Sequence, residues 1–277
     1  MQREIPHLEF LAIDQLIIHE WHDIQRTEPL VQRIRQSGLW RNPPVVTLLD
    51  DGSGRFMVLD GANRYTALER MGIPHILVQV VEAESPGLEL QNWNHVVWEM
   101  DPLEFQHRIR SIPETELVPS SILVEPDLWG SCGLALIHLA NHEIYSLCTD
   151  ETELVRRVDM LNSLVKSYKD SGRLDRTLVR ELSNLEGYYP QLCGLVVFPM
   201  FEVSDIMALA GAGYLLPAGI TRFTISPRAL HVNYPLSELA ADKPLAEKNA
   251  QLQLWIQERV ASKGIRYYAE PTFLFDE

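Results

Sequence analysis

The segment from Met57 to Tyr65, MVLDGANRY, constrains this chain more than any other. An apolar run predicts a strand that ends on Asp60, Gly61 permits a tight turn, and helix-forming residues follow at once. A helix that begins there presents the free N–H groups of its first turn and the positive end of its dipole. Such a terminus binds anions, and Arg64 adds donors that suit phosphate oxygens. The segment predicts a phosphate-binding loop, unless Asp60-Gly61 is only a turn and Arg64 a surface residue.

The first hundred residues alternate strand and helix patterns with short connections, which predicts a compact α+β unit. Residues 43–49 and 55–59 are apolar, β-branched runs on either side of DDGSG, which indicates a hairpin. Thr27 is expected to cap a helix that ends at Gly38. The other expected elements of this unit are strands at 13–18 and 76–81 and a helix at 62–71.

The remainder of the chain has weaker patterns. Residues 85–130 are rich in proline and carry tryptophans, so we expect an irregular segment that crosses between units. Farther on, the patterns predict helices at 152–168, 175–185, 204–211 and 245–262, a buried strand at 195–201, a hairpin formed by 223–225 and 230–234, and a terminal strand at 267–275. We therefore predict two domains, residues 1–105 and residues 106–277, the second being a mixed α/β domain.

Charge and composition limit the possible partners. The formal net charge of −14 opposes binding to phosphate backbones, although Arg33, Arg35 and Arg41 could form a local basic patch instead of a solvated helix face. No apolar run reaches the roughly 18 residues that a membrane span needs, and the first residues do not resemble a secretory signal. The three cysteines are far apart, which predicts reduced thiols in a cytoplasmic protein.

Four stretches together carry a family resemblance. They are LIIHE (16–20), the loop MVLDGANRY (57–65), WNH (93–95) and LPAGITRFTIS (216–226). The chain resembles the free-serine kinases of the ParB/sulfiredoxin-like superfamily, including those that act as regulators in staphyloferrin-type siderophore gene clusters. The resemblance implies a ParB/sulfiredoxin-like N-terminal domain, with the active site in the cleft between the two domains. The loop lacks the cysteine that sulfiredoxins need, so sulfiredoxin chemistry is excluded.

The resemblance implies a kinase that transfers a phosphoryl group from ATP or ADP to the hydroxyl of free L-serine, with Mg²⁺, and makes O-phospho-L-serine. Glu20 is the implied general base, and Asp60 would hold Mg²⁺ or steer the transferred group. The implied nucleotide-binding residues are His19, Gly61, Ala62, Asn63 and Arg64, and the implied substrate-binding residues are Trp93, His95, Thr221 and Arg222.

Several alternatives stay open. The family usually has histidine where this chain has Asn63, and an amide can donate a hydrogen bond but cannot carry charge, so a non-catalytic member is one alternative. A ligand-sensing transcriptional regulator is another. A ParB-type DNA clamp would need a helix-turn-helix where the chain is Pro-rich. Without the resemblance, Glu20 would be a solvated glutamate, Trp93 a core residue and Arg222 a salt-bridge partner. The helix that carries Trp255 is expected to be core or a homodimer face.

Overall fold

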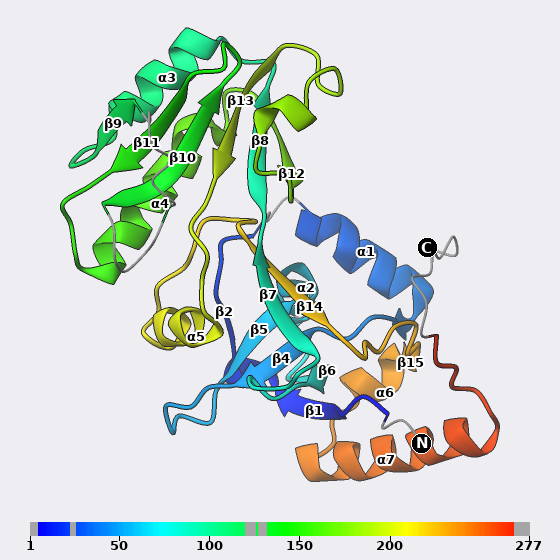
Figure 1. Ribbon diagram of the computed structural model, residues 1–277. Coiled ribbons are helices and arrows are strands. Elements are labelled where there is room, and N and C mark those ends of the chain that lie inside the picture. Colours follow the sequence, from blue (N-terminus) through cyan, green and yellow to red (C-terminus); the bar gives the residue numbers. More distant parts are fainter. Residues whose placement is uncertain (1–4, 23–25, 120–125, 127–131, 269–277) are drawn as a thin grey trace.

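The computed structural model describes residues 5–22, 26–119, 126 and 132–268, and it has a mixed α+β fold (Figure 1). One body of the molecule contains a five-stranded sheet and the other a six-stranded sheet. The five-stranded sheet has the order β1-β6-β4-β5-β2. Its strands are β1 (Leu8–Ala12), β2 (Leu16–Ile18), β4 (Val45–Leu48), β5 (Phe56–Asp60) and β6 (His75–Val80).

Most predictions for the first hundred residues are confirmed. Strands β4 and β5 pair antiparallel as the predicted hairpin. Helices α1 (Thr27–Ser37) and α2 (Ala62–Arg70) occupy the predicted places, and Gly38 ends α1 in the left-handed region. The cap prediction is wrong by one residue, because Arg26 precedes α1 and Thr27 is its first residue. The predicted strand at 13–18 begins as a short 3₁₀ helix, and only its second half pairs, in parallel with β5.

The six-stranded sheet corrects two predictions. Its order is β12-β8-β13-β10-β11-β9, with α3 (Pro102–Arg110) and α4 (Leu154–Lys169) in the same body (Figure 1). The segment expected to be irregular supplies β7 (Leu88–Asn92), β8, α3 and β9. The helix expected at 175–185 is an edge strand followed by a 3₁₀ turn. The strands of this sheet are β8 (Asn94–Trp98), β9 (Glu116–Pro119), β10 (Gly133–Leu139), β11 (Ile144–Cys148), β12 (Arg173–Thr177) and β13 (Leu192–Val197).

A two-stranded ribbon connects the two bodies (Figure 1). Strand β7 (Leu88–Asn92) pairs antiparallel with β14 (Thr221–Ile225). The hairpin predicted for 223–234 is therefore wrong, because β14 pairs with β7 while β15 (Tyr234–Pro235) pairs with β3 (Leu39–Trp40). Helices α6 (Leu236–Ala240) and α7 (Leu245–Ala261) then pack against β6 and β1. Each body thus contains segments from both halves of the chain.

The alternation of β4 and β5 places their side chains in two cores. Val46 and Val58 join α1, α2 and α7 in one cluster. Val45 and Met57 point the other way and join a larger cluster that includes α4 and α5 (Val203–Gly211). The second cluster extends into the six-stranded sheet, so apolar packing fixes the two bodies against each other at this point.

None of the described helices is both long enough and apolar enough to cross a bilayer. The strand predicted at 267–275 lies outside the described residues from residue 269 onward, and residues 264–268 have no regular structure.

Candidate active site

Gly61 shapes the predicted phosphate loop. It precedes α2 with φ 103°, and its carbonyl accepts the N–H groups of Arg64 and Tyr65, both at 2.9 Å. A Cβ atom at residue 61 would lie 2.8 Å from Arg64 Nη2 and 3.0 Å from the Cα atom of Pro44. Only glycine fits this conformation and this space. The backbone N–H groups of Ala62 and Asn63, the first two residues of α2, have no partner within the helix. They point out of the helix start, where an anion can bind.

Asp60 lies between two guanidinium groups. Its Oδ2 atom accepts a hydrogen bond from Arg64 Nη2 at 2.7 Å and another from Arg228, which follows β14. Burial raises the pKa of Asp60, but the two arginines outweigh it and hold the pKa below its usual value. The carboxylate is therefore ionised at neutral pH, and Arg64 is held at the start of α2.

Glu20 is fixed through both its backbone and its side chain. Its backbone bridges to Leu216, whose carbonyl accepts the Trp21 N–H at 2.9 Å. Its Oε2 atom accepts hydrogen bonds from the Thr221 hydroxyl at 2.8 Å and from the Gly219 N–H at 3.1 Å. No described residue bonds to the other oxygen, Oε1. One oxygen therefore orients the carboxylate, and the second is available to a ligand.

His19 is buried and uses both ring nitrogens. Nδ1 lies 2.7 Å from the Val58 carbonyl oxygen, and Nε2 lies 2.8 Å from the Thr221 hydroxyl. Because a carbonyl only accepts, Nδ1 carries a proton. Burial lowers the pKa of His19, with Glu20 acting in the opposite direction, so the ring is neutral and Nε2 is an acceptor. The Thr221 hydroxyl has one hydrogen, which Nε2 and the Glu20 carboxylate must share.

His95 is fully buried and contacts the same loop from the other side. Its Nδ1 lies 2.9 Å from the Tyr168 hydroxyl and its Nε2 lies 3.1 Å from the Gly219 carbonyl oxygen. Burial lowers the pKa of His95 to about 3, so the ring is neutral and Nε2–H donates to Gly219. His95 thus holds the backbone of Gly219, whose N–H holds Glu20.

Trp93 connects β7 to β8, and its backbone N–H donates to the Ile220 carbonyl oxygen at 3.0 Å. The guanidinium of Arg222 stacks over its ring at 4.8 Å and donates from Nη1 to Gln91 Oε1 at 2.6 Å. The Arg222 side chain is therefore held by Gln91 of β7 and by the Trp93 ring. Trp93 contributes a flat apolar wall braced by this cation–π contact.

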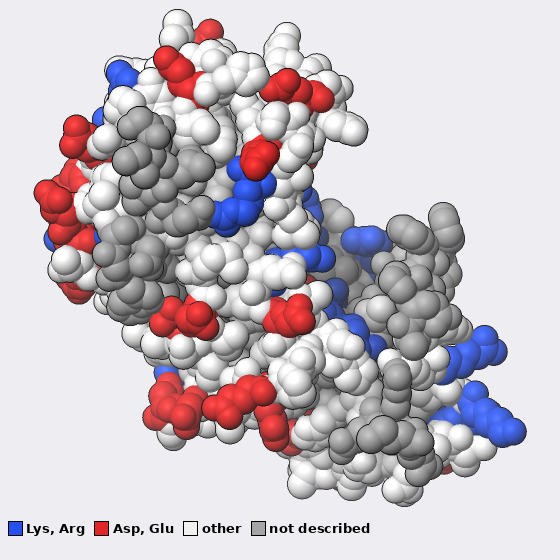
Figure 2. Space-filling model, in the orientation of Figure 1, with Lys and Arg blue, Asp and Glu red and all other residues white. Residues whose placement is uncertain are grey.

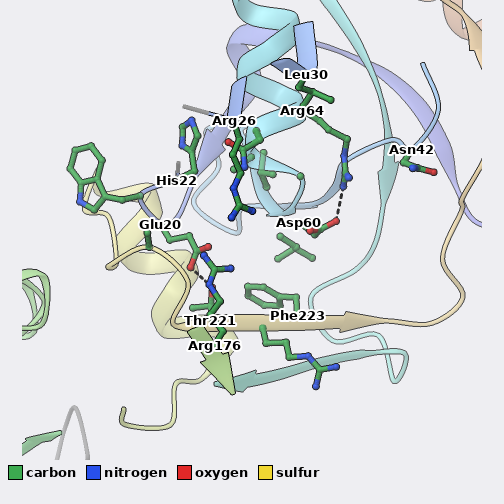
Figure 3. Close-up of a pocket in the computed structure, with 18 of the residues that line it drawn as sticks. Glu20, His22, Arg26, Leu30, Asn42, Asp60, Arg64, Arg176, Thr221 and Phe223 are labelled. Carbon is green, nitrogen blue, oxygen red and sulfur yellow. Dashed lines mark hydrogen bonds and ion pairs between the residues drawn. The ribbon is translucent and has the colours of Figure 1, made fainter. Parts of the chain in front are cut away.

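One cavity of about 1430 Å³ lies between the two bodies and is lined by His19, Glu20, Asp60, Gly61, Arg64, Trp93, His95, Thr221 and Arg222, among others. Figure 3 shows Glu20 and Thr221 on one side and Asp60 with Arg64 on the other. Basic residues outnumber acidic ones in the lining, although the whole chain has a net charge of −14. Figure 2 shows several blue groups in the hollow between the two bodies, and others elsewhere on the surface. The basic lining residues are Arg26, Arg33, Arg41, Arg64, Lys169, Arg176 and Arg222, and the acidic ones are Glu20, Asp60 and Asp175.

No protein-family model matches the chain. The ATP-dependent L-serine kinase SbnI of Staphylococcus aureus (strain NCTC 8325 / PS 47) is 27% identical over 281 residues, which cover 98% of each chain. The structure of C-terminally truncated SbnI from Staphylococcus aureus has a TM-score of 0.71 at 23% identity, covering 93% of this chain and 97% of the truncated chain. The structure of a mutant free serine kinase in complex with ADP has a TM-score of 0.70 at 13% identity, covering 86% of this chain and 95% of that chain.

The resemblance to the free-serine kinases is confirmed. Every residue predicted through that resemblance lines the same cavity, including those from the four stretches that are far apart in the sequence. Arg33 and Arg41, considered as a solvated helix face, also line it, whereas Arg35 does not.

Two arginines of the site were not predicted. Arg228 directly follows the stretch that resembles the free-serine kinases, so its place after Ser226-Pro227 was a usable signal. Arg176 lies in the segment expected to be a helix, and nothing in its sequence pattern indicated a site. Within the described ranges, no group of three or more His, Cys, Asp or Glu side chains is arranged to hold a metal ion.

Proposed function

We propose that this chain is a kinase that transfers a phosphoryl group from ATP to the hydroxyl of free L-serine and makes O-phospho-L-serine. The observation that carries the proposal is the state of Glu20. Two donors fix its Oε2, while Oε1 has no bond to a described residue and lies in a basic cavity that also contains a helix N-terminus. A general base and an anion site in one cavity are what phosphoryl transfer to an alcohol needs.

The loop at the start of α2 would bind the nucleotide phosphates. The N–H groups of Ala62 and Asn63 and the guanidinium of Arg64 supply donors, and Gly61 provides the close approach. Asn63 Oδ1 is buried without a partner among the described residues, and as an acceptor it could take a hydrogen bond from a nucleotide N–H or O–H group but not from a phosphate oxygen. Because of this loop, we also propose that the N-terminal unit is ParB/sulfiredoxin-like.

Asp60 is the residue that would hold Mg²⁺. Both arginines bond to its Oδ2, which leaves Oδ1 for a metal ion whose other ligands would be phosphate oxygens and water. One carboxylate fits this mode, since Mg²⁺ in such sites needs few protein ligands. The ion would screen the charge of the transferred group.

In the reaction, the serine oxygen bonds to the γ-phosphorus as the bond from that phosphorus to the β–γ bridging oxygen breaks. The hydroxyl proton passes to Glu20, and ADP leaves. The proton would be received at Oε1, because Oε2 keeps its hydrogen bonds from the Thr221 hydroxyl and the Gly219 N–H. These two bonds would hold the carboxylate in one orientation during the transfer.

The remaining predicted residues would form the substrate side. Trp93 and Thr221 would contact the amino acid, Arg222 would keep the Trp93 ring in place, and His95 would act through Gly219. His19 would act as a positioning residue between β5 and Thr221.

The proposal is tested by incubating the purified protein with Mg²⁺, L-serine and either ATP or ADP, and measuring O-phosphoserine by mass spectrometry. We expect product with ATP and a loss of about 10²- to 10⁴-fold in kcat for Glu20→Gln, with nucleotide affinity unchanged. No product from a folded, nucleotide-binding protein with either donor would overturn the proposal. Product formed equally well by Glu20→Gln would remove Glu20 as the base.

A further inference from the structure

Arg176 lies on β12, the edge strand of the six-stranded sheet, opposite His95 of β8. Its side chain is exposed to solvent and lines the cavity (Figure 3). There the guanidinium lies against Gly219, because a Cβ atom at residue 219 would come within 2.1 Å of Arg176 Cζ. The residue therefore reaches from the second body to the loop that holds Glu20.

Two of the other arginines of the cavity, Arg64 and Arg222, have partners of their own. Arg64 bonds to Asp60, and Arg222 bonds to Gln91 and stacks on Trp93. In the part of the chain that the structure describes, the guanidinium of Arg176 makes no hydrogen bond and no ion pair. A positive charge with five N–H donors thus faces the cavity without an internal anion.

Gly219 relates this charge to the general base. Its N–H bonds to Glu20 Oε2 at 3.1 Å, its carbonyl accepts from His95, and its α-carbon faces Arg176. Its φ of 74° favours glycine. One glycine therefore touches both side chains, and a ligand the size of an amino acid can have its hydroxyl at Glu20 and its other end at Arg176.

We propose that Arg176 binds the carboxylate of the amino-acid substrate and so distinguishes it from small alcohols that lack a carboxylate. The inference rests on the proposed kinase function. A guanidinium matches a carboxylate in a bidentate, charge-assisted arrangement. A substrate without the carboxylate does not form this charge-assisted pair, so it binds more weakly.

The test compares L-serine with ethanolamine, which has the amine and the hydroxyl but no carboxylate. In Arg176→Met we expect KM for L-serine to rise about 10- to 100-fold, KM for ATP to stay unchanged, and the rate with ethanolamine to stay as low as in the wild type. Arg176→Lys should lie between, because it keeps the charge but not the bidentate geometry. Arg173→Met is the matched control, since Arg173 is on the same strand but pairs with Glu99 at 2.8 Å outside the cavity.

Calorimetric titration of L-serine in the presence of a non-hydrolysable ATP analogue separates this inference from the kinase proposal. Weaker L-serine binding to Arg176→Met, with unchanged binding of the analogue, supports Arg176 even if turnover is absent. Equal L-serine affinity in the two proteins, or no L-serine binding to the wild type, overturns the inference. Equal losses with L-serine and ethanolamine also overturn it, because they indicate a structural role.

Discussion

The Thr221 hydroxyl is central to the site at the scale of single residues. Its oxygen lies 2.8 Å from both His19 Nε2 and Glu20 Oε2, yet it has one hydrogen to donate. His19 Nε2 and the Glu20 carboxylate both accept, so the single hydroxyl hydrogen serves one contact at a time. The hydroxyl orients Glu20 through Oε2 and does not occupy Oε1.

Replacing Thr221 tests this arrangement. Thr221→Val keeps the shape but removes the hydroxyl, so we expect kcat to fall by about 10- to 100-fold, the range for a lost hydrogen bond to a charged group. Thr221→Ser keeps the hydroxyl and should stay within about threefold of the wild type. Single-turnover rates of phosphoserine formation at saturating ATP measure both. If the valine and serine variants had equal rates, the hydroxyl would have no part in orienting Glu20 for the reaction.

His95 gives a prediction about stability and pH. Its pKa is about 3 in the folded protein against 6.5 in the unfolded chain, so the unfolded state binds more protons between these values. Folding stability should therefore fall as pH decreases from 6.5 toward 3, by about 1.4 kcal/mol per pH unit from this residue alone. In His95→Gln this part of the slope should be absent, although the variant is less stable at neutral pH. Urea unfolding between about pH 6.5 and about pH 4.5 measures it, and parallel slopes for the two proteins would contradict it.

The roles of single residues differ in how far sequence could predict them. The physics of strand, glycine and helix predicted the local structure of residues 57–65 without any relative, while its binding of phosphate stays a prediction. Glu20 and Thr221 are 201 positions apart, and only the resemblance associated them. Arg176 could not be predicted, because its side chain meets Gly219 through a fold that brings an edge strand to a distant loop.

At the scale of elements, α2 is flanked by two glycines with positive φ, Gly61 at 103° just before it and Gly72 at 70° two residues after its end. Alanine at either position should cost about 1 kcal/mol or more of unfolding free energy through backbone strain. Only Gly61→Ala should also lose ATP affinity, because its Cβ atom would displace the Arg64 guanidinium, whereas nothing lies within 4 Å of a Cβ at Gly72. Urea unfolding and titration with ATP measure the two effects. Equal ATP affinity in the two variants would refute the role of Gly61.

The elements that sequence predicted correctly have a pattern that local physics produces. Helix α4 buries Val158, Leu161 and Val165 at helical spacing, and β4 and β5 are apolar runs around a turn. The errors lie in elements without such a pattern. β8 is five residues long with a fully buried middle, and β12 is a polar edge strand, so their neighbours in space define them.

At the scale of the whole molecule, the distribution of charge separates the cavity from the rest of the surface. The chain has a net charge of −14, but the lining is mostly basic (Figure 2). A basic hollow with low-dielectric walls concentrates small anions, while the overall charge repels a long polyanion. The charge pattern thus favours a free nucleotide over duplex DNA.

Ionic strength tests this separation. We expect the Kd for ATP, at constant excess Mg²⁺, to rise at least about threefold between about 50 mM and about 500 mM NaCl, because salt screens the exposed arginines of the cavity. Arg33→Gln combined with Arg41→Gln should flatten this dependence. Arg259→Gln on α7 is the control and should not change this dependence, since Arg259 is not among the lining residues and its guanidinium lies over the Trp255 ring.

A short DNA duplex should show no mobility shift with the protein at about 50 mM salt, where electrostatic binding is strongest. If the wild type bound the duplex and the double variant did not, these arginines would serve nucleic acid. If salt did not affect the Kd for ATP, the charge of the cavity would not attract the nucleotide.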